Sequence, residues 1–161
     1  TPPSGQPASS IPQKIVWFVL LLGVLLLCAK VFLEYSRSQA FPETGSTHWF
    51  SMADHPKKAL LRIEAPKGSL RKYVVQLNDA QSGEPVVHVF INPGETSFTV
   101  LPLGRYTVTL YKGFMWQGTR YFFGITGEIQ KMPGLLDFHQ AGNEITGYRV
   151  RLDAAMQDWG Q

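Results

Sequence analysis

Two pairs of neighbouring side chains in this 161-residue chain combine an imidazole with a carboxylate. Asp54 directly precedes His55, and Asp137 lies two positions before His139, on the same face if that segment is a strand. An imidazole beside a carboxylate can act as an acid–base pair or ligate a metal ion. A zinc site needs three or four converging ligands, and no third ligand is spaced to join either pair. We therefore expect surface or turn roles for these four residues, and no metal site.

Other patterns typical of catalysis are missing from the sequence. It contains no glycine-rich phosphate loop, no nucleophile elbow and no metal-binding helix motif, and no serine or threonine lies in a recognisable triad context. His88 falls within an apolar run, where a half-buried histidine with a hydrogen-bond partner is more common than a ligand. The sequence therefore predicts no catalytic residue and no cofactor.

The most aromatic stretch outside the N-terminal region is a candidate contact site. Phe114 and Trp116 lie between two glycines, and Tyr121 opens a run of three aromatic residues. Tryptophan and tyrosine are favoured at interfaces, and an aromatic loop can also stack on a sugar or insert into lipid. The alternative is that Trp116 and one face of residues 121–123 close the end of the domain core. Trp49 is a similar candidate for contact with headgroups or a membrane partner.

The element that must position these residues is an unbroken apolar run near the N-terminus. Residues 15–27 read IVWFVLLLGVLLL, and with later apolar residues the run reaches the roughly 17–25 residues that span a bilayer core. We predict a transmembrane helix over residues 14–35. Trp17 and Tyr35 lie where interfacial aromatic residues are expected, and Lys30 can extend its ammonium to the headgroups. Gly23 has no second small residue at the spacing of a tight helix pair.

Three alternatives to a membrane anchor fit the residues less well. A cleavable signal peptide places small residues directly after the apolar core, whereas Glu34 and Arg37 come before the nearest candidates. Bulky leucines before Cys28 disfavour lipid attachment there, and a buried soluble helix would need apolar neighbours on every side.

For the orientation of the anchor, the flanking positive charges slightly favour a cytoplasmic C-terminal side. The layout of an uncleaved signal anchor favours export of that side, which is the orientation we expect.

The rest of the sequence divides into a tail, a linker and one small domain. We expect a flexible tail over residues 1–13, a linker over residues 36–47 and a domain over residues 48–158. Phe41-Pro-Glu-Thr-Gly45 resembles a sortase signal, but such a signal precedes a membrane segment, so we interpret it as a linker turn. The net charge of +3 is too small to indicate nucleic-acid binding. Cys28 is the only cysteine, which excludes an intrachain disulfide.

Alternation of apolar and polar residues in the predicted domain indicates a mainly β fold. Turn-forming residues separate the alternating runs, and no strong helical stretch intervenes. This pattern predicts an antiparallel β-sandwich of about seven strands. The expected strands cover residues 60–63, 72–78, 86–91, 97–100, 105–110 and 148–152, with shorter ones at 119–123 and 135–138.

The segment Leu101-Pro-Leu-Gly-Arg-Tyr-Thr-Val resembles a signature of prealbumin-like β-sandwiches, which include repeat domains of bacterial adhesins and a domain of carboxypeptidases. The resemblance implies that a strand ends here, that a tight turn follows at Gly104, and that Tyr106 begins the next strand facing the core. A longer pattern from Tyr73 to Gly124 is similar to a group of uncharacterised bacterial single-pass membrane proteins. That similarity implies no known activity.

These observations predict a non-catalytic, membrane-anchored interaction protein, an accessory or structural subunit of a larger membrane complex. Its expected partners are membrane lipid and other integral membrane proteins, reached through the helix and the β-domain. An alternative is an anchored module that binds carbohydrate or an envelope polymer through Trp116 and its neighbours. An envelope hydrolase that uses the two Asp–His pairs has the least support. The expected location is a bacterial inner membrane, with the C-terminal domain in the periplasm.

Overall fold

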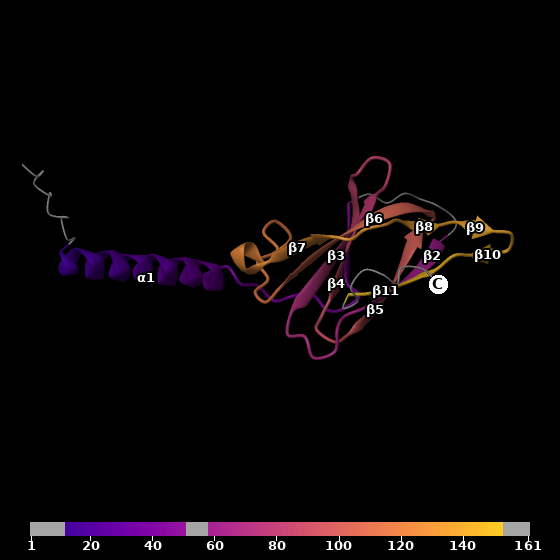
Figure 1. The fold of residues 1–161 in the computed structure, drawn as a ribbon. Helices are drawn as coiled ribbons and strands as arrows, with labels where there is room; N and C mark the ends of the chain where they lie inside the picture. The colour runs from indigo at the N-terminus through magenta and orange to yellow at the C-terminus, as the bar shows by residue number, and fades with distance from the viewer. Residues whose placement is uncertain (1–11, 51–57, 153–161) are drawn as a thin grey trace, which may run out of the picture. The chain divides into compact units, whose positions relative to one another are not determined.

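The protein consists of a helix and a β-domain, which are separate compact units that divide between Arg37 and Ser38. The computed structural model describes residues 12–50 and 58–152, without the side chain of residue 34 (Figure 1). The first unit holds helix α1, Gln13–Ser36, which extends one residue beyond each predicted boundary. The prediction of a mainly β chain with one N-terminal apolar helix is confirmed.

Among the described residues, the β-domain contains eleven strands and one short 3₁₀ helix. Their bounds are β1 Thr47–Trp49, β2 Lys58–Glu64, β3 Lys72–Asp79, β4 Pro85–Ile91, β5 Thr96–Pro102, β6 Gly104–Gly113, η1 Gly124–Thr126, β7 Glu128–Lys131, β8 Leu136–Phe138, β9 Gln140–Ala141, β10 Glu144–Ile145 and β11 Tyr148–Arg151. The larger sheet has the order β1-β4-β3-β6-β7, with β8 also paired to β6. The smaller sheet has the order β11-β2-β5, and β9 pairs with β10.

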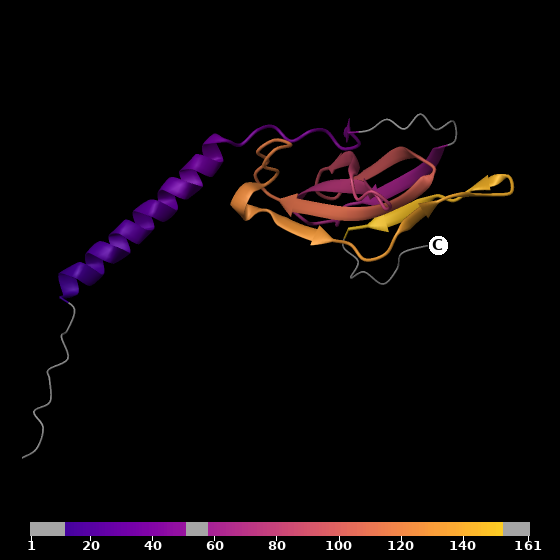
Figure 2. The ribbon, with the colours of Figure 1, turned by 90° about the horizontal axis from the view of Figure 1, so that it is seen from above.

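The larger sheet and the smaller sheet pack face to face around one apolar core (Figure 2). Leu61 and Ile63 of β2 are fully buried in the same cluster as Leu77 of β3 and Val89 of β4. The domain is therefore a β-sandwich, as the alternation predicts. The ladder between β11 and β2 is parallel, whereas the other described ladders are antiparallel. Residues 65–147, which contain β3 to β10, connect these two strands and supply the crossover that a parallel pair requires.

Burial explains why the strands have two kinds of sequence. β2 and β5 each bury one face in the core and expose the other. In β5 the buried positions include Ser97 and Thr99, whereas Phe98 and Val100 are exposed. β3 and β4 are buried on both faces, because the outer face of the larger sheet is also covered. The run over residues 86–91, apolar except for His88, is thus the sequence of a strand covered on both sides.

The turn between β5 and β6 has the structure that the family resemblance implies. Gly104 has φ 157°, and a Cβ at this position would lie 3.4 Å from Tyr106 Oη. Tyr106 is buried in the core, and its hydroxyl donates a 3.0 Å hydrogen bond to the carbonyl oxygen of Pro102. Burial raises the pKa of this hydroxyl, which keeps it protonated as a donor. The Leu-Pro-x-Gly-x-Tyr spacing therefore encodes a chain reversal that carries the backbone from one sheet to the other.

One expected strand is a turn, and four observed strands were not expected. Residues 119–123 form successive turns, in which Phe122 N–H donates to Gly118 O and Gly124 N–H donates to Tyr121 O. The aromatic composition of this segment, typical of a strand, instead serves packing onto the outer face of the larger sheet. The short strands β1, β7, β9 and β10 lie outside the expected set.

Most of the predicted linker belongs to the β-domain. Residues 38–46, which we call the strap segment, run along the larger sheet and lead into β1. Gly45 N–H donates to Phe90 O at 2.9 Å, and Phe90 N–H donates to Ser46 O at 3.1 Å. The segment that includes the residues resembling a sortase signal therefore extends the edge of the larger sheet beside β4. These backbone hydrogen bonds leave no periodic apolar pattern in residues 38–46.

Candidate functional site

An aromatic cluster covers the outer face of the larger sheet. Val74 of β3 and Phe90 of β4 form its base, and Trp116 and Phe123 from the loop after β6 pack over them. The ring of Phe41, from the strap segment, lies 5.4 Å from that of Trp116 and 5.7 Å from that of Phe90, edge-on to both. Edge-to-face pairs are a favoured aromatic geometry. The cluster acts as a second core that holds the 114–127 loop on the sheet.

Two glycines allow Phe123 to approach the backbone closely. A Cβ at Gly113 would lie 2.4 Å from the Cβ of Phe123, and one at Gly127 would lie 2.9 Å from it. The preceding residue, Phe122, has φ 52° and lies in the left-handed region that bulky residues seldom adopt. This conformation stacks its ring on Tyr111 with the centroids 4.1 Å apart. The loop conformation is therefore set by packing rather than by local preference.

The four predicted contact residues behave differently in the structure. Trp116 is 3% exposed and offers no aromatic face to a partner, whereas Trp49 is partly buried against the main core. The burial of Trp116 contradicts its assignment as a contact residue and removes the residue on which a sugar-stacking site depended. The competing interpretation, that it closes the domain, is the one observed. Phe114 and Tyr121 are each 51% exposed and remain candidates for contact.

The predicted anchor residues all lie on α1 with their side chains exposed. Trp17 lies in the second turn and Tyr35 in the last turn, and Lys30 is also exposed. A Cβ at Gly23 would meet no atom within 4 Å. The structure leaves these four positions available to lipid or to another helix.

His88 lies in a polar and aromatic network on the outer face of the larger sheet. It is 2% exposed, and its Nε2 lies 2.8 Å from Gln76 Oε1, while its Nδ1 has no hydrogen-bond partner among the described residues. Burial, and secondarily the charge of His48, lower the pKa of His88 to about 4. The neutral tautomer of His88 with its proton on Nε2 donates a hydrogen bond to Gln76 Oε1. The buried imidazole then carries no charge. The expected hydrogen-bond partner is present, and His88 is more deeply buried than the half-buried histidine that we expected.

Of the two Asp–His pairs, the one at Asp137 and His139 lies within the described residues. His139 Nδ1 lies 3.8 Å from Asp137 Oδ1, and both side chains are exposed at the surface. Asp54 and His55 lie outside the described residues. No group of three histidine, cysteine or acidic residues within residues 12–50 and 58–152 has the spacing to hold a metal ion. The expected surface role holds for Asp137 and His139.

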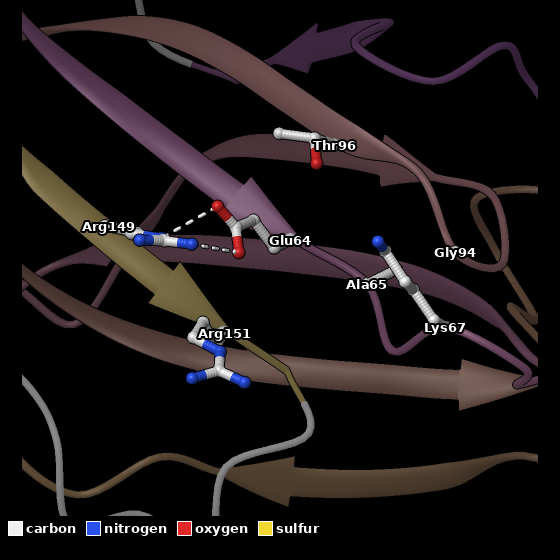
Figure 3. Close-up of a pocket in the computed structure, with 7 residues that line it drawn as sticks. All are labelled: Glu64, Ala65, Lys67, Gly94, Thr96, Arg149 and Arg151. Atoms are coloured by element: carbon white, nitrogen blue, oxygen red, sulfur yellow. Dashed lines mark hydrogen bonds and ion pairs between the residues drawn. The ribbon is translucent and has the colours of Figure 1, made fainter.

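A hollow of about 470 Å³ lies where β2 and β11 end, and its lining is largely cationic (Figure 3). Arg149 donates two hydrogen bonds to the Glu64 carboxylate, at 2.7 and 2.9 Å. These bonds lower the pKa of Glu64, so its charge is retained at neutral pH. Lys67 and Arg151 add two further cations to the lining. The hollow therefore has an excess of positive charge and favours a small anionic group over a cation.

The outer face of the smaller sheet carries an apolar patch beside an open strand edge. Phe98 and Val100 of β5 are 59% and 50% exposed, and Leu60 of β2 lies opposite Val100. Among the described strands, β5 pairs with β2 on one side only. An exposed apolar edge strand is a ready template for a strand from another chain. We call Leu60, Phe98 and Val100 the β5 patch.

Sequence reasoning missed the β5 patch and the cationic hollow. The alternation in β5 was visible, but its exposed positions hold phenylalanine and valine where an outward face normally holds polar residues. That departure was a usable signal. No local signal joins Glu64 to Arg149, because the two residues are 85 positions apart and meet only where β11 pairs with β2.

Comparison of the chain with known protein families, curated proteins and solved structures finds no match. The assignment of function therefore rests on the described surfaces.

Proposed function

We propose that this protein is a single-pass, membrane-anchored interaction protein, an accessory subunit that binds other components of a membrane complex. The observation that carries the proposal is the surface of α1. An 18-residue window within Gln13–Leu33 has a mean hydropathy of 2.7, and none of this window is buried in the structure. Burying one leucine or valine side chain away from water gains about 1.5–3 kcal/mol. A helix that is apolar on every side is stable only inside a membrane or a larger core.

A cleaved signal sequence has the same length and hydropathy, so the proposal needs a direct test. Membranes that contain the full chain would be washed with alkaline carbonate, and the retained protein would be sized. An anchor keeps the intact chain in the membrane pellet. Release of the protein, or loss of the mass of α1, would overturn the anchor. The charged residues directly after the apolar run support retention over cleavage.

The β5 patch supports the interaction half of the proposal. A partner strand beside β5 would satisfy the backbone groups on the open edge of that strand. Its apolar side chains would cover Phe98, Val100 and Leu60, which are at least half exposed. A protein partner with an extended apolar segment fits this surface better than a small ligand does, because the patch is a sheet face and strand edge.

Co-purification in mild detergent tests this partner. The full chain with Phe98→Thr and Val100→Thr is expected to lose proteins that the unchanged chain retains, while its thermal unfolding stays similar. Leu135→Thr is the matched control, because Leu135 is an exposed apolar residue outside the β5 patch. A chain that elutes alone before any substitution would contradict the accessory role. If the double variant retains the same proteins as the unchanged chain, the partner binds another surface.

The proposed location is a bacterial inner membrane, with the β-domain on the periplasmic side. The layout of an uncleaved signal anchor and the resemblance of residues 73–124 to bacterial single-pass proteins support it. Protease added to intact spheroplasts is expected to remove the β-domain. Protection in spheroplasts combined with digestion in inverted vesicles would show the opposite orientation.

A further inference from the structure

Four exposed apolar side chains gather at one end of the sandwich. Leu70 comes from the loop before β3, and Phe114, Tyr121 and Ile125 come from the 114–127 loop. The register of β3 with β6 places Lys72 opposite Gly113, so the two loops start from neighbouring positions. The guanidinium of Arg71 lies over the Phe114 ring at 5.6 Å and links them. None of the residues of η1, which includes Ile125, is buried.

Charge is divided unequally between the two ends of the sandwich. We call the end where β2, β4, β6 and β11 finish the basic end, and the opposite one the acidic end. The described cations at the basic end are Lys67, Arg71, Lys72, Lys112, Arg120, Arg149 and Arg151, with Glu43, Glu64, Glu95 and Glu128 as its acidic residues. The described charges at the acidic end are Asp79, Glu84, Asp137 and Glu144 with Lys58 and Arg105. Leu70, Phe114, Tyr121 and Ile125 thus lie on the positively charged end.

Covalent connection ties the basic end to the helix. The last residue of α1 is Ser36, and Gln39 N–H already donates a 2.7 Å hydrogen bond to Trp116 O in the 114–127 loop. Both Figure 1 and Figure 2 show the strap segment beside this loop within the β-domain. Three residue steps span at most about 10 Å. Only Arg37 and Ser38 therefore separate the last residue of α1 from a residue that is hydrogen-bonded to the 114–127 loop.

We propose that the basic end binds the headgroup surface of an anionic bilayer leaflet beside the anchor. This proposal rests on the proposed membrane insertion of α1. The headgroup layer of a bilayer is about 5–7 Å deep on each side, so the short tether brings the loop to that depth. Phe114, Tyr121 and Ile125 reach the boundary between headgroups and acyl chains. The surrounding lysines and arginines bind lipid phosphates through charge attraction. The cationic hollow at Lys67 and Arg151 extends this binding surface.

The test places a fluorescent reporter at each end of the full chain in lipid nanodiscs. Cys28→Ala removes the natural thiol, and Ile125→Cys then carries an environment-sensitive fluorophore at the basic end. Ile145→Cys is the matched control, since Ile145 is also an exposed isoleucine but belongs to β10 at the acidic end. Discs of phosphatidylcholine alone are compared with discs that include phosphatidylglycerol, and a brominated lipid serves as quencher.

In anionic discs, the fluorescence emission of the Ile125 reporter is expected to shift to the blue and to be quenched by the brominated lipid. The emission of the Ile145 reporter is expected to change in neither kind of disc. About 1 M salt shortens the screening length to about 3 Å and should abolish the difference. The triple variant Lys67→Gln, Lys72→Gln and Arg120→Gln should abolish it at low salt. If this variant folds poorly, the comparison between low salt and high salt decides the outcome.

An Ile125 reporter that stays unquenched in carbonate-resistant protein overturns the lipid contact and leaves the anchor standing. Quenching that is equal in neutral and anionic discs overturns the role of charge. A chain that carbonate extracts overturns the anchor, and the lipid contact with it. An Ile125 reporter that is shielded only when a co-purified protein is present assigns this surface to that protein instead.

Discussion

Gly113 is the position at which the outer aromatic cluster depends most directly on the absence of a side chain. A Cβ there would lie 2.4 Å from the Cβ of Phe123, which is well inside contact distance. Since Phe123 is 1% exposed, it has no space to move into. We predict that Gly113→Ala lowers the free energy of unfolding by about 1–3 kcal/mol, the usual cost of overpacking. Urea unfolding of the variant measures this loss.

The partner residue provides the control for Gly113. In a Phe123→Leu background the smaller side chain relieves the contact, so Gly113→Ala should cost less there than in the unchanged chain. Equal costs in the two backgrounds would show that the contact with Phe123 is not the cause.

His88 makes stability depend on pH. Its pKa of about 4 in the folded chain lies below the ordinary value of 6.5, because burial disfavours the imidazolium. The unfolded chain therefore binds more protons between these two values. The contribution of neutral His88 is complete above pH 6.5 and is lost as the pH falls towards 4. We predict a loss of about 2 kcal/mol across this interval, measured by denaturant unfolding at each pH.

The variant His88→Gln isolates this effect from the carboxylates. It should flatten the slope of stability between pH 6.5 and 4. If His88→Gln keeps the original slope, another group titrates in this range.

At the scale of elements, the strap segment is held to the larger sheet by one aromatic side chain and several backbone hydrogen bonds. Phe41 contacts Phe90, Trp116 and Phe123 with ring centroids 5.4–6.1 Å apart. We predict that Phe41→Ala costs about 2 kcal/mol, less than a fully buried phenylalanine, because Phe41 is only half buried. Hydrogen exchange at the Gln39 and Gly45 amides should accelerate in this variant.

Phe114→Ala is the control for the strap segment. Phe114 is 51% exposed and lies outside the aromatic cluster, so its removal should leave exchange at both amides unchanged. Faster exchange at both amides in this variant would indicate that the 114–127 loop, rather than Phe41, holds the strap segment.

The elements also separate what sequence patterns predict from what they miss. β2, β3, β4, β5, β6 and β11 were predictable because alternation or a long apolar run marks a strand with a buried face. β1 and β7 are short edge strands that are stabilised by backbone pairing with β4 and β6. Their side chains are mostly exposed and leave little pattern. The turn at residues 119–123 was misread because aromatic residues suit both strands and buried loops.

At the scale of the whole molecule, membrane insertion depends on the apolar length of α1. An arginine at the middle of a membrane helix costs about 2.5–3.5 kcal/mol on insertion. We predict that Leu25→Arg decreases the carbonate-resistant fraction of the protein and that a second change, Leu21→Arg, abolishes it. Leu135→Arg, in the β-domain, should have no effect. Unchanged insertion of the double variant would contradict the membrane-spanning role.

The sequence by itself determined the class of each unit, because apolar length and alternation depend only on neighbouring residues. The run at residues 15–27 indicated a helix that is apolar on every side, and the alternation indicated a sandwich. The Leu-Pro-x-Gly-x-Tyr spacing indicated the turn at Gly104.

The tertiary structure alone decided which side chains are surface and which are core. Trp116 and Phe114 are two residues apart, yet one is buried by rings from the strap segment and β4 while the other is exposed. The basic end likewise forms from loops that are distant in the chain and meet through strand register. Burial and charge clustering depend on contacts between distant segments, and no local pattern encodes them.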